Sequence, residues 1–352
     1  MPRSTDNPWL TRFAWLTAIV TFALVGLGGL VTSHEAGMAV PDWPTTYGYN
    51  MFLFPPSKWI GGIFYEHTHR LLASLVGMLT AILAVWLWIK ESRRWMRWLG
   101  VIASVAVILQ AVLGGLRVVL YRDQIGIFHA ALAQSFLCLL CLIALFTTRW
   151  WQCFSGSLLR SDYAGNLRWL TPIVTGLIFG QLVLAATMRH QHAGLAIPDF
   201  PLAYHKLWPP TDPESVANYN SRRVEMTALN PITAVQILLQ MAHRLVAVVI
   251  FSGIGLAALA ARRELGGRHP ISRLSLGWFI LVCLQVVLGA YTIWSNKAAD
   301  VATGHVMVGA TCLVFGVVLT AVAFRALIPA RVARNAKNRA IADLTTVKPA
   351  AN

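Results

Sequence analysis

Long apolar runs alternate with short polar segments over most of the 352 residues of the chain. Eight of these runs reach the length of about 20 residues that a helix needs to cross the hydrocarbon core of a bilayer. They lie at 13–32, 67–89, 97–119, 125–147, 169–188, 233–261, 274–295 and 302–324. Because an open chain satisfies its backbone groups in lipid only as helices, the pattern predicts an all-α polytopic membrane protein with eight transmembrane helices.

Composition and charge add an orientation to this picture. Hydrophobic residues make up 57% of the chain and charged residues 12%, which excludes a soluble globular domain. Nineteen Lys and Arg fall in the termini and in the segments between alternate runs, whereas only eight fall in the segments on the other side. By the positive-inside rule both termini are cytoplasmic, and the loops 33–63 and 189–232 face outward from the cell (inner) membrane. The net charge of +15 is therefore an orientation signal, and no nucleic-acid partner is expected.

Two halves of the chain repeat each other. The loop sequence AGMAVPDWP at 36–44 returns as AGLAIPDFP at 193–201, and QAVLGGLRV at 110–118 returns as QVVLGAYTI at 285–293. A repeat of four spans gives both copies the same orientation, so we expect two pseudo-symmetric four-helix bundles related by an axis along the membrane normal. The predicted division is an N-terminal bundle at 1–150, a cytoplasmic linker at 151–168, a C-terminal bundle at 169–325 and a basic cytoplasmic tail at 326–352.

Each half carries two histidines at matched positions. EHTHR at 66–70 corresponds to QMAHR at 240–244, so His243 is the counterpart of His69 in the second half. His129 at the start of the fourth run corresponds to His305 at the start of the eighth. All four belong to runs that enter the membrane from the outer side, so we expect them at similar depth, with two in each bundle. Ionisable groups in membrane spans are costly and tend to mark function.

Two facing imidazoles in a four-helix bundle are a natural axial pair for haem iron. Zinc is the second candidate, although a zinc site needs more ligands than two histidines. Arg70 and Arg244 directly follow the first histidine of each pair, where a guanidinium either binds haem propionates or extends toward lipid headgroups. His67 points away from His69 around the helix and is a weaker ligand candidate.

Four further histidines have no matched partner and are interpreted as surface or loop residues: His34, His190, His192 and His205. Asp42 and Asp199 occupy equivalent turns and are predicted to fix loop geometry.

Position 66 breaks the repeat, because Glu66 in the first half corresponds to Gln240 in the second. The two side chains share a shape, but only glutamate takes up a proton or carries a negative charge. Glu66 lies three residues before His69, on the same helix face. The pattern favours one reactive bundle, in which Glu66 accepts a proton, and one bundle that stores or passes electrons.

At this point the sequence resembles the haem A synthase family. The resemblance rests on GGLVTSHEAGMAVPDWPTTYG, EHTHR, GGLRV with FHAALAQ, and their counterparts in the second half, and it extends from about residue 13 to 324. It implies an enzyme that oxidises the C8 methyl of haem O to a formyl group through a hydroxymethyl intermediate. It also implies that His69 and His129 hold the iron of haem O, that Glu66 is catalytic, and that His243 and His305 hold a haem b cofactor.

One departure from the family concerns the first outer loop, where some members carry a cysteine pair and residues 33–63 carry none. The expected partners are haem O as substrate, the haem O synthase (protohaem farnesyltransferase) that supplies it and a membrane electron carrier, with a homo-oligomer as a candidate assembly. The alternative function is a dihaem b-type membrane electron-transfer cytochrome with two equivalent haems. A transporter is disfavoured, because the runs show no matched helix break near mid-membrane.

Overall fold

The computed structural model describes residues 7–153, 164–222 and 231–326. Eight of its helices are long and apolar enough to cross a membrane, which confirms the all-α, eight-span prediction. They are α1 (Pro8–Ser33), α2 (Gly62–Lys90), α3 (Arg94–Val119), α4 (Ile125–Thr147), α6 (Ala164–His190), α8 (Ala234–Leu265), α9 (Pro270–Trp294) and α10 (Ala299–Ala326). The observed ends differ from the predicted ones by about five residues or fewer. The predicted cytoplasmic tail lies almost entirely outside the described residues.

Several helix starts carry the caps that their sequences encode. Asn7 accepts hydrogen bonds from the backbone N–H groups of Trp9 and Leu10, and Pro8 occupies the first helical position of α1, where a proline lacks only a donor that would be unpaired anyway. Thr233 and Gln236 form a reciprocal capping box at the start of α8. The starts of α1 and α8 are therefore set by local sequence.

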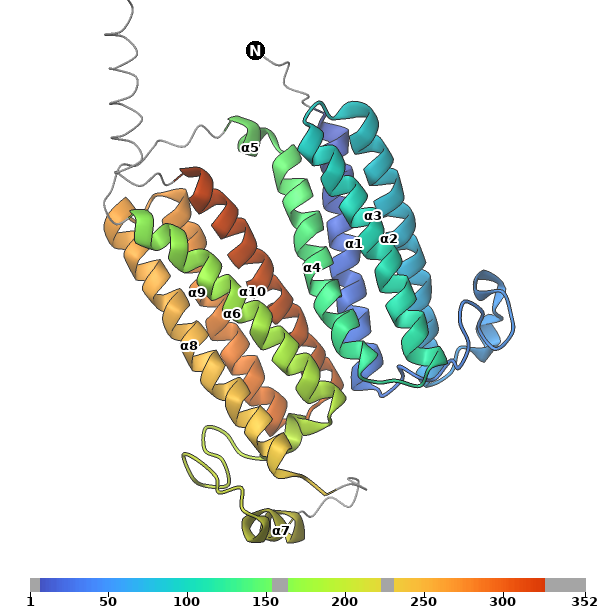
Figure 1. Cartoon of the computed structure of the whole chain (residues 1–352), viewed down its shortest axis with the longest axis vertical. Helices are drawn as coiled ribbons and strands as arrows, with labels where there is room; N and C mark the ends of the chain where they lie inside the picture. The colour runs from blue at the N-terminus through green and yellow to red at the C-terminus, as the bar shows by residue number, and fades with distance from the viewer. Residues whose placement is uncertain (1–6, 154–163, 223–230, 327–352) are drawn as a thin grey trace, which may run out of the picture.

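The eight helices form two groups of four. In each group every helix packs against two neighbours, in the order α1–α2–α3–α4 for the first and α6–α8–α9–α10 for the second. Figure 1 shows the groups side by side as two bundles. The interface between them joins α1 and α4 to α6 and α10. The first bundle has an apolar core centred on Leu83, Leu137 and Leu140, and the second on Ile254 and Trp278.

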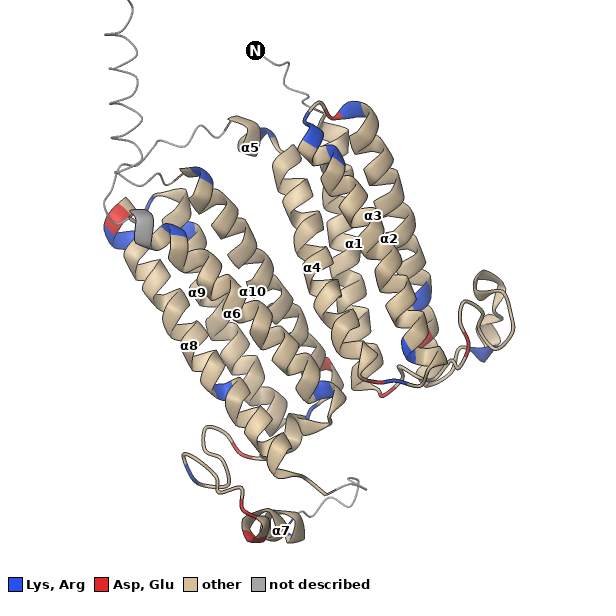
Figure 2. Cartoon of the chain, in the orientation of Figure 1, with Lys and Arg blue, Asp and Glu red and all other residues tan. Residues whose placement is uncertain are grey.

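Four shorter helical segments lie outside the spans: η1 (Met51–Leu53) and η2 (Pro56–Lys58) in the first long loop, and η3 (Ala193–Leu195) and α7 (Pro213–Ser221) in the second. A fifth, α5 (Arg149–Cys153), follows α4 at the opposite end of the bundles. Both long loops extend from one end of the molecule in Figure 1. Charged side chains gather at the two ends of the helices and leave the middle of the bundles almost free of them (Figure 2), as a membrane requires.

Equivalent turns open the two long loops. Asp42 accepts hydrogen bonds from the N–H groups of Tyr47 and Gly48, and Asp199 accepts from those of Tyr204 and His205. The prediction that both aspartates fix loop geometry is therefore confirmed. These turns place the loop backbone over the ends of α2 and α8, where the candidate site begins.

Candidate functional site

Glu66 and its counterpart Gln240 each form hydrogen bonds with the backbone of one long loop. The Glu66 carboxylate accepts the N–H of Val40 at 2.8 Å and pairs with the Arg70 guanidinium at 2.6 Å. The Gln240 amide accepts the N–H of Ile197 at 2.7 Å and donates to the carbonyl of the same residue at 3.2 Å. Both side chains are buried. An ionisable group therefore occupies the same buried anchor position in the first half that a neutral amide occupies in the second.

The two arginines bind loop carbonyls. Arg70 donates to the carbonyls of Val40, Asp42 and Thr45 at 2.7–3.0 Å. Arg244 donates to the carbonyls of Asp199 and Leu202 at 2.7 and 2.8 Å. Neither sequence interpretation, haem propionates or lipid headgroups, includes these contacts. The N–H on Nε of Arg244 is buried and has no partner, so this side chain keeps one donor for an anionic group.

The four matched histidines lie near the looped ends of α2, α4, α8 and α10, one on each helix. Each is half-buried, yet the Nδ1 atom of every one is fully buried without a hydrogen-bond partner. The sealed Nδ1 edge leaves Nε2 as the nitrogen available to a bound group, although Nε2 of His305 lies 3.4 Å from the side-chain nitrogen of Gln285. Within the first bundle His69 and His129 are close enough to interact electrostatically, and so are His243 and His305 within the second. The structure thus pairs the histidines as the repeat predicts.

A glycine of the neighbouring helix backs three of the four imidazoles. Gly28, Gly114 and Gly289 face His69, His129 and His305, and a Cβ on these glycines would lie 3.2, 3.3 and 3.1 Å from the ring Cε1. Such separations are tighter than ordinary contact, so a side chain there would displace the ring. The glycines therefore let each imidazole lie directly against a helix backbone, which fixes where the ring sits.

This donor set fits haem better than zinc. A haem iron takes two axial imidazoles and needs no carboxylate or thiolate, and each bundle supplies one pair. A closed zinc site takes four ligands, and no group of three or more His, Cys, Asp or Glu gathers in the part of the chain that the structure describes. Each bundle offers two imidazoles, and three of the four rings lie against a glycine of a neighbouring helix. This arrangement fits a flat macrocycle that binds between helices.

In addition to position 66, positions 46 and 67 also differ between the halves. His67 is fully buried, with Nδ1 at 3.3 Å from the Thr46 hydroxyl, and its ring packs against Phe54 and Trp59 of the first loop. Met241 and Ala203 occupy the equivalent places in the second half and belong to an apolar cluster. His67 therefore contacts the loop, and its Nε2 is buried without a partner.

Sequence reasoning missed a polar network between the bundles. His190, interpreted from sequence as a surface or loop residue, is buried and lies 3.1 Å from an oxygen of Asp123, which also pairs with Arg117 at 2.6 Å. The interpretation of His190 is thus wrong, because the fold brings the end of α6 against the start of α4. The only available signal was that Arg117 breaks the repeat at the position of Thr292.

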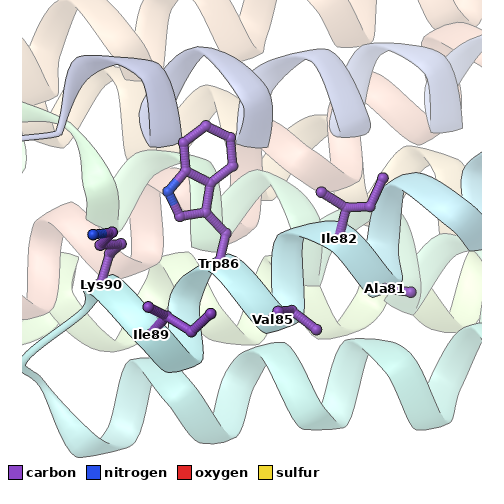
Figure 3. A pocket seen from close by; sticks show the side chains of 6 residues that line it. All are labelled: Ala81, Ile82, Val85, Trp86, Ile89 and Lys90. Atoms are coloured by element: carbon purple, nitrogen blue, oxygen red, sulfur yellow. The ribbon is translucent and has the colours of Figure 1, made fainter.

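A groove on the outside of the first bundle is separate from these groups. Ala81, Ile82, Val85, Trp86, Ile89 and Lys90 line it, all on α2 (Figure 3). Val85 follows His69 by sixteen residues, about 24 Å along the helix. Lys90 is the charged residue of its lining, and the groove takes no part in the site.

Comparison with known proteins agrees with the geometry. The family model described as cytochrome oxidase assembly protein matches residues 58–319, a span that includes all four histidines. The Heme A synthase of Geobacillus kaustophilus is 28% identical over 300 residues, covering 82% of this chain and 83% of that protein. The Heme A synthase of Lysinibacillus sphaericus is 27% identical over 309 residues, covering 85% and 90%. That of Bacillus cereus strain AH187 is 29% identical over 308 residues, covering 83% and 86%.

Proposed function

This chain belongs to the cytochrome oxidase assembly protein family, and on that premise we propose that it is a haem A synthase, as its relatives are named. The proposed reaction oxidises the C8 methyl of haem O first to hydroxymethyl and then to formyl. Written with water as the oxygen source, CH3 and H2O give CHO, four protons and four electrons. A membrane electron carrier takes the electrons, two for each oxidation step.

In this proposal the first bundle is the reactive one. His69 and His129 hold the iron of haem O, and the glycines behind them fix the plane of each ring. Glu66 accepts protons released as the methyl is oxidised. Its carboxylate uses two of about four acceptor sites on Val40 and Arg70, so it retains capacity for a proton. The i, i+3 spacing to His69 supports a place near the edge of the bound macrocycle.

The second bundle has the complementary role. His243 and His305 hold haem b, which when bound supplies a one-electron relay. Gln240 keeps the loop anchored without a titratable group. The unpartnered Nε donor of Arg244 supports a contact with a propionate, whereas the Arg70 guanidinium serves mainly to hold the first loop and orient Glu66.

The proposed location is the cell membrane, with both termini cytoplasmic and the long loops outside. The chain is a multi-pass membrane protein. Its charge distribution supports the orientation, because Arg93 caps the start of α3 and Arg94 and Arg97 lie in its first turn, at the end opposite the long loops. The proposed units are residues 1–150 for haem O and 169–325 for haem b.

The difference between Glu66 and Gln240 in otherwise matched sites carries the proposal. A pure electron-transfer protein needs no carboxylate in one half only. The test is extraction of pigments from the purified protein after expression with a source of haem O. Haem A or the hydroxylated intermediate beside haem b is the expected result, and haem b alone at both sites would overturn the assignment.

One observation favours the alternative, a dihaem electron-transfer cytochrome. The contacts of Glu66 with Val40 closely parallel those of Gln240 with Ile197, so a glutamate at position 66 is already explained as a loop anchor. The two functions differ in what the carboxylate does beyond anchoring, and substitution of Glu66 separates them.

A further inference from the structure

The last two residues of α6 reach out of the second bundle and contact the first. Arg189 and His190 end this helix, and both side chains point across the interface that α6 shares with α1 and α4. By the repeat offset of the loop motif, their counterparts in the first half are Thr32 and Ser33. At these two matched positions, ionisable side chains of the second half reach toward the first bundle, which contains Glu66, whereas the first half carries neutral hydroxyl groups.

His190 docks on the first turn of α4. Its Nδ1 lies 3.1 Å from Asp123 Oδ2, and its ring lies so close to Gly126 that a Cβ there would overlap it. Gly126 precedes His129 by three residues, less than one helical turn. The position of His190 therefore fixes the start of the helix that carries one of the two histidines of the first pair.

Asp123 links this contact to the rest of the first bundle. Its other oxygen accepts two hydrogen bonds from Arg117 of α3, at 2.6 and 3.2 Å. Burial alone would raise the pKa of Asp123, but the hydrogen bonds from Arg117 and His190 outweigh it and hold the pKa below its ordinary value. Asp123 is thus an anion between two donors from different bundles.

Arg189 makes the corresponding contact with α1. Its Nη2 donates to the carbonyl of Gly29 at 2.7 Å and to the hydroxyl of Ser33 at 2.6 Å. Gly29 follows Gly28, the residue that backs the His69 ring. Ser33 in turn lies 3.3 Å from Thr303, two residues before His305. Both acceptors of Arg189 are neutral, and the matched histidine with which its guanidinium interacts electrostatically is His305.

We propose that Arg189 and His190 are positioning residues that hold the His69 and His129 imidazoles in the orientation the first haem requires. The first site then depends on docking of the second bundle, beyond what either bundle supplies alone. This inference rests on the proposed function, since it needs a haem on each histidine pair. It predicts that removal of the His190 contact alters the first haem while leaving the second haem intact.

The test uses full-length protein purified in detergent with its haems. His190→Ala removes the contact with Asp123, whereas His190→Asn keeps a donor near the position of Nδ1. Arg189→Met removes the charge, and Arg189→Lys keeps it. Arg222→Met and His205→Gln, exposed in the second loop, are the matched controls. The readouts are the low-spin ferric signals in electron paramagnetic resonance, which report the relative orientation of axial imidazoles, and the midpoint potential of each haem.

We expect His190→Ala to shift the signal and potential of the first haem only, with His190→Asn restoring both. Arg189→Met should shift the first-haem signal, because the contact with Gly29 is lost. It should also lower the midpoint potential of the second haem, because the cation near His305 favours the reduced form. Wild-type spectra of both haems in every variant would overturn the inference. Equal loss of both haems with a lower unfolding temperature would also overturn it, since that describes a docking contact only. Wild-type protein without haem on the histidine pairs would instead count against the proposed function.

Discussion

Gln240 holds Ile197 by both of its backbone groups, accepting the N–H at 2.7 Å and donating to the carbonyl at 3.2 Å. In the first half the two equivalent hydrogen bonds to Val40 come from two different residues. Glu66 accepts the N–H of Val40, and Arg70 donates to the Val40 carbonyl. A carboxylate cannot donate, so the glutamate requires the arginine as its partner. The exchange at position 66 therefore makes Arg70 indispensable to the first loop, whereas Arg244 has a smaller task in the second.

Replacing Arg70 by Met should loosen the first loop selectively. The change leaves three loop carbonyls without the Arg70 donor and the buried Glu66 carboxylate without its cationic partner. Removing one partner of a buried ion pair typically costs about 3–5 kcal/mol. Limited trypsin digestion should therefore cleave faster after Lys58 in the first loop, with cleavage after Lys206 in the second loop unchanged.

Arg244→Met is the matched control, and it should show the reverse pattern with a smaller effect, because Arg244 has two carbonyl acceptors and no carboxylate. Equal cleavage at Lys58 in wild type and Arg70→Met would show that the guanidinium does not hold the loop.

Replacing Thr46 by Ala and His67 by Met, the residues found at the equivalent positions 203 and 241 of the second half, should preserve both haems. His67→Met alone leaves the buried Thr46 hydroxyl without its partner, at a cost of about 1–3 kcal/mol. Adding Thr46→Ala should recover most of that loss, because Met241 and Ala203 pack in the same places. Thermal unfolding and haem content per protein measure the two effects. Loss of one haem from both variants would identify His67 as a ligand and contradict the assignment of His69.

The sequence was sufficient to predict the eight helices, since the length of an apolar run and the bilayer thickness determine a span almost alone. The repeat also identified His69 and His243, and His129 and His305, as equivalent positions, which lie near the starts of α2 and α8 and of α4 and α10. The contacts of Arg70 and Arg244 were beyond it. They depend on where the backbone of a turn directs its carbonyl groups. Every residue has a carbonyl, so the pattern of side chains does not predict these acceptors.

The polar network at the bundle interface could not be predicted from the sequence either. His190 and Asp123 are 67 residues apart, and neither belongs to a repeated motif. Their contact follows from the packing of α6 against α4, which helix periodicity within one segment does not encode. A residue that breaks a repeat, as Arg117 does, is the available sequence signal for such contacts between halves.

His243→Ala and His305→Ala should each remove the haem of the second bundle and leave the first bundle able to bind haem O. Each imidazole belongs to one pair only, and the core of the first bundle contains neither residue. Reduced-minus-oxidised spectra and extracted pigments of the purified variants give the measurement. Loss of all haem from each single variant would contradict two separate sites.

Both long loops should react from outside the cell. Ser57→Cys and Ser221→Cys place thiols at exposed positions in these loops, and the native Cys153 is exposed at the opposite end of the bundles. A membrane-impermeant maleimide applied to intact cells should label the two new thiols and spare Cys153. Labelling of Cys153 under the same conditions would reverse the proposed orientation.

Proton transfer at Glu66 is the central step of the proposed reaction, and Glu66→Gln tests it most directly. The substitution reproduces the amide that Gln240 already uses, so folding and haem binding should survive, which spectra of the purified protein check. Loss of a general base typically slows a reaction about 10²–10⁴-fold. The decisive measurement is the ratio of haem A to haem O and its hydroxylated form in cells expressing Glu66→Gln at wild-type protein level, with Gln240→Glu as the matched control. We predict that haem O or the intermediate replaces haem A in Glu66→Gln only, and a normal proportion of haem A in that variant would contradict proton transfer at Glu66.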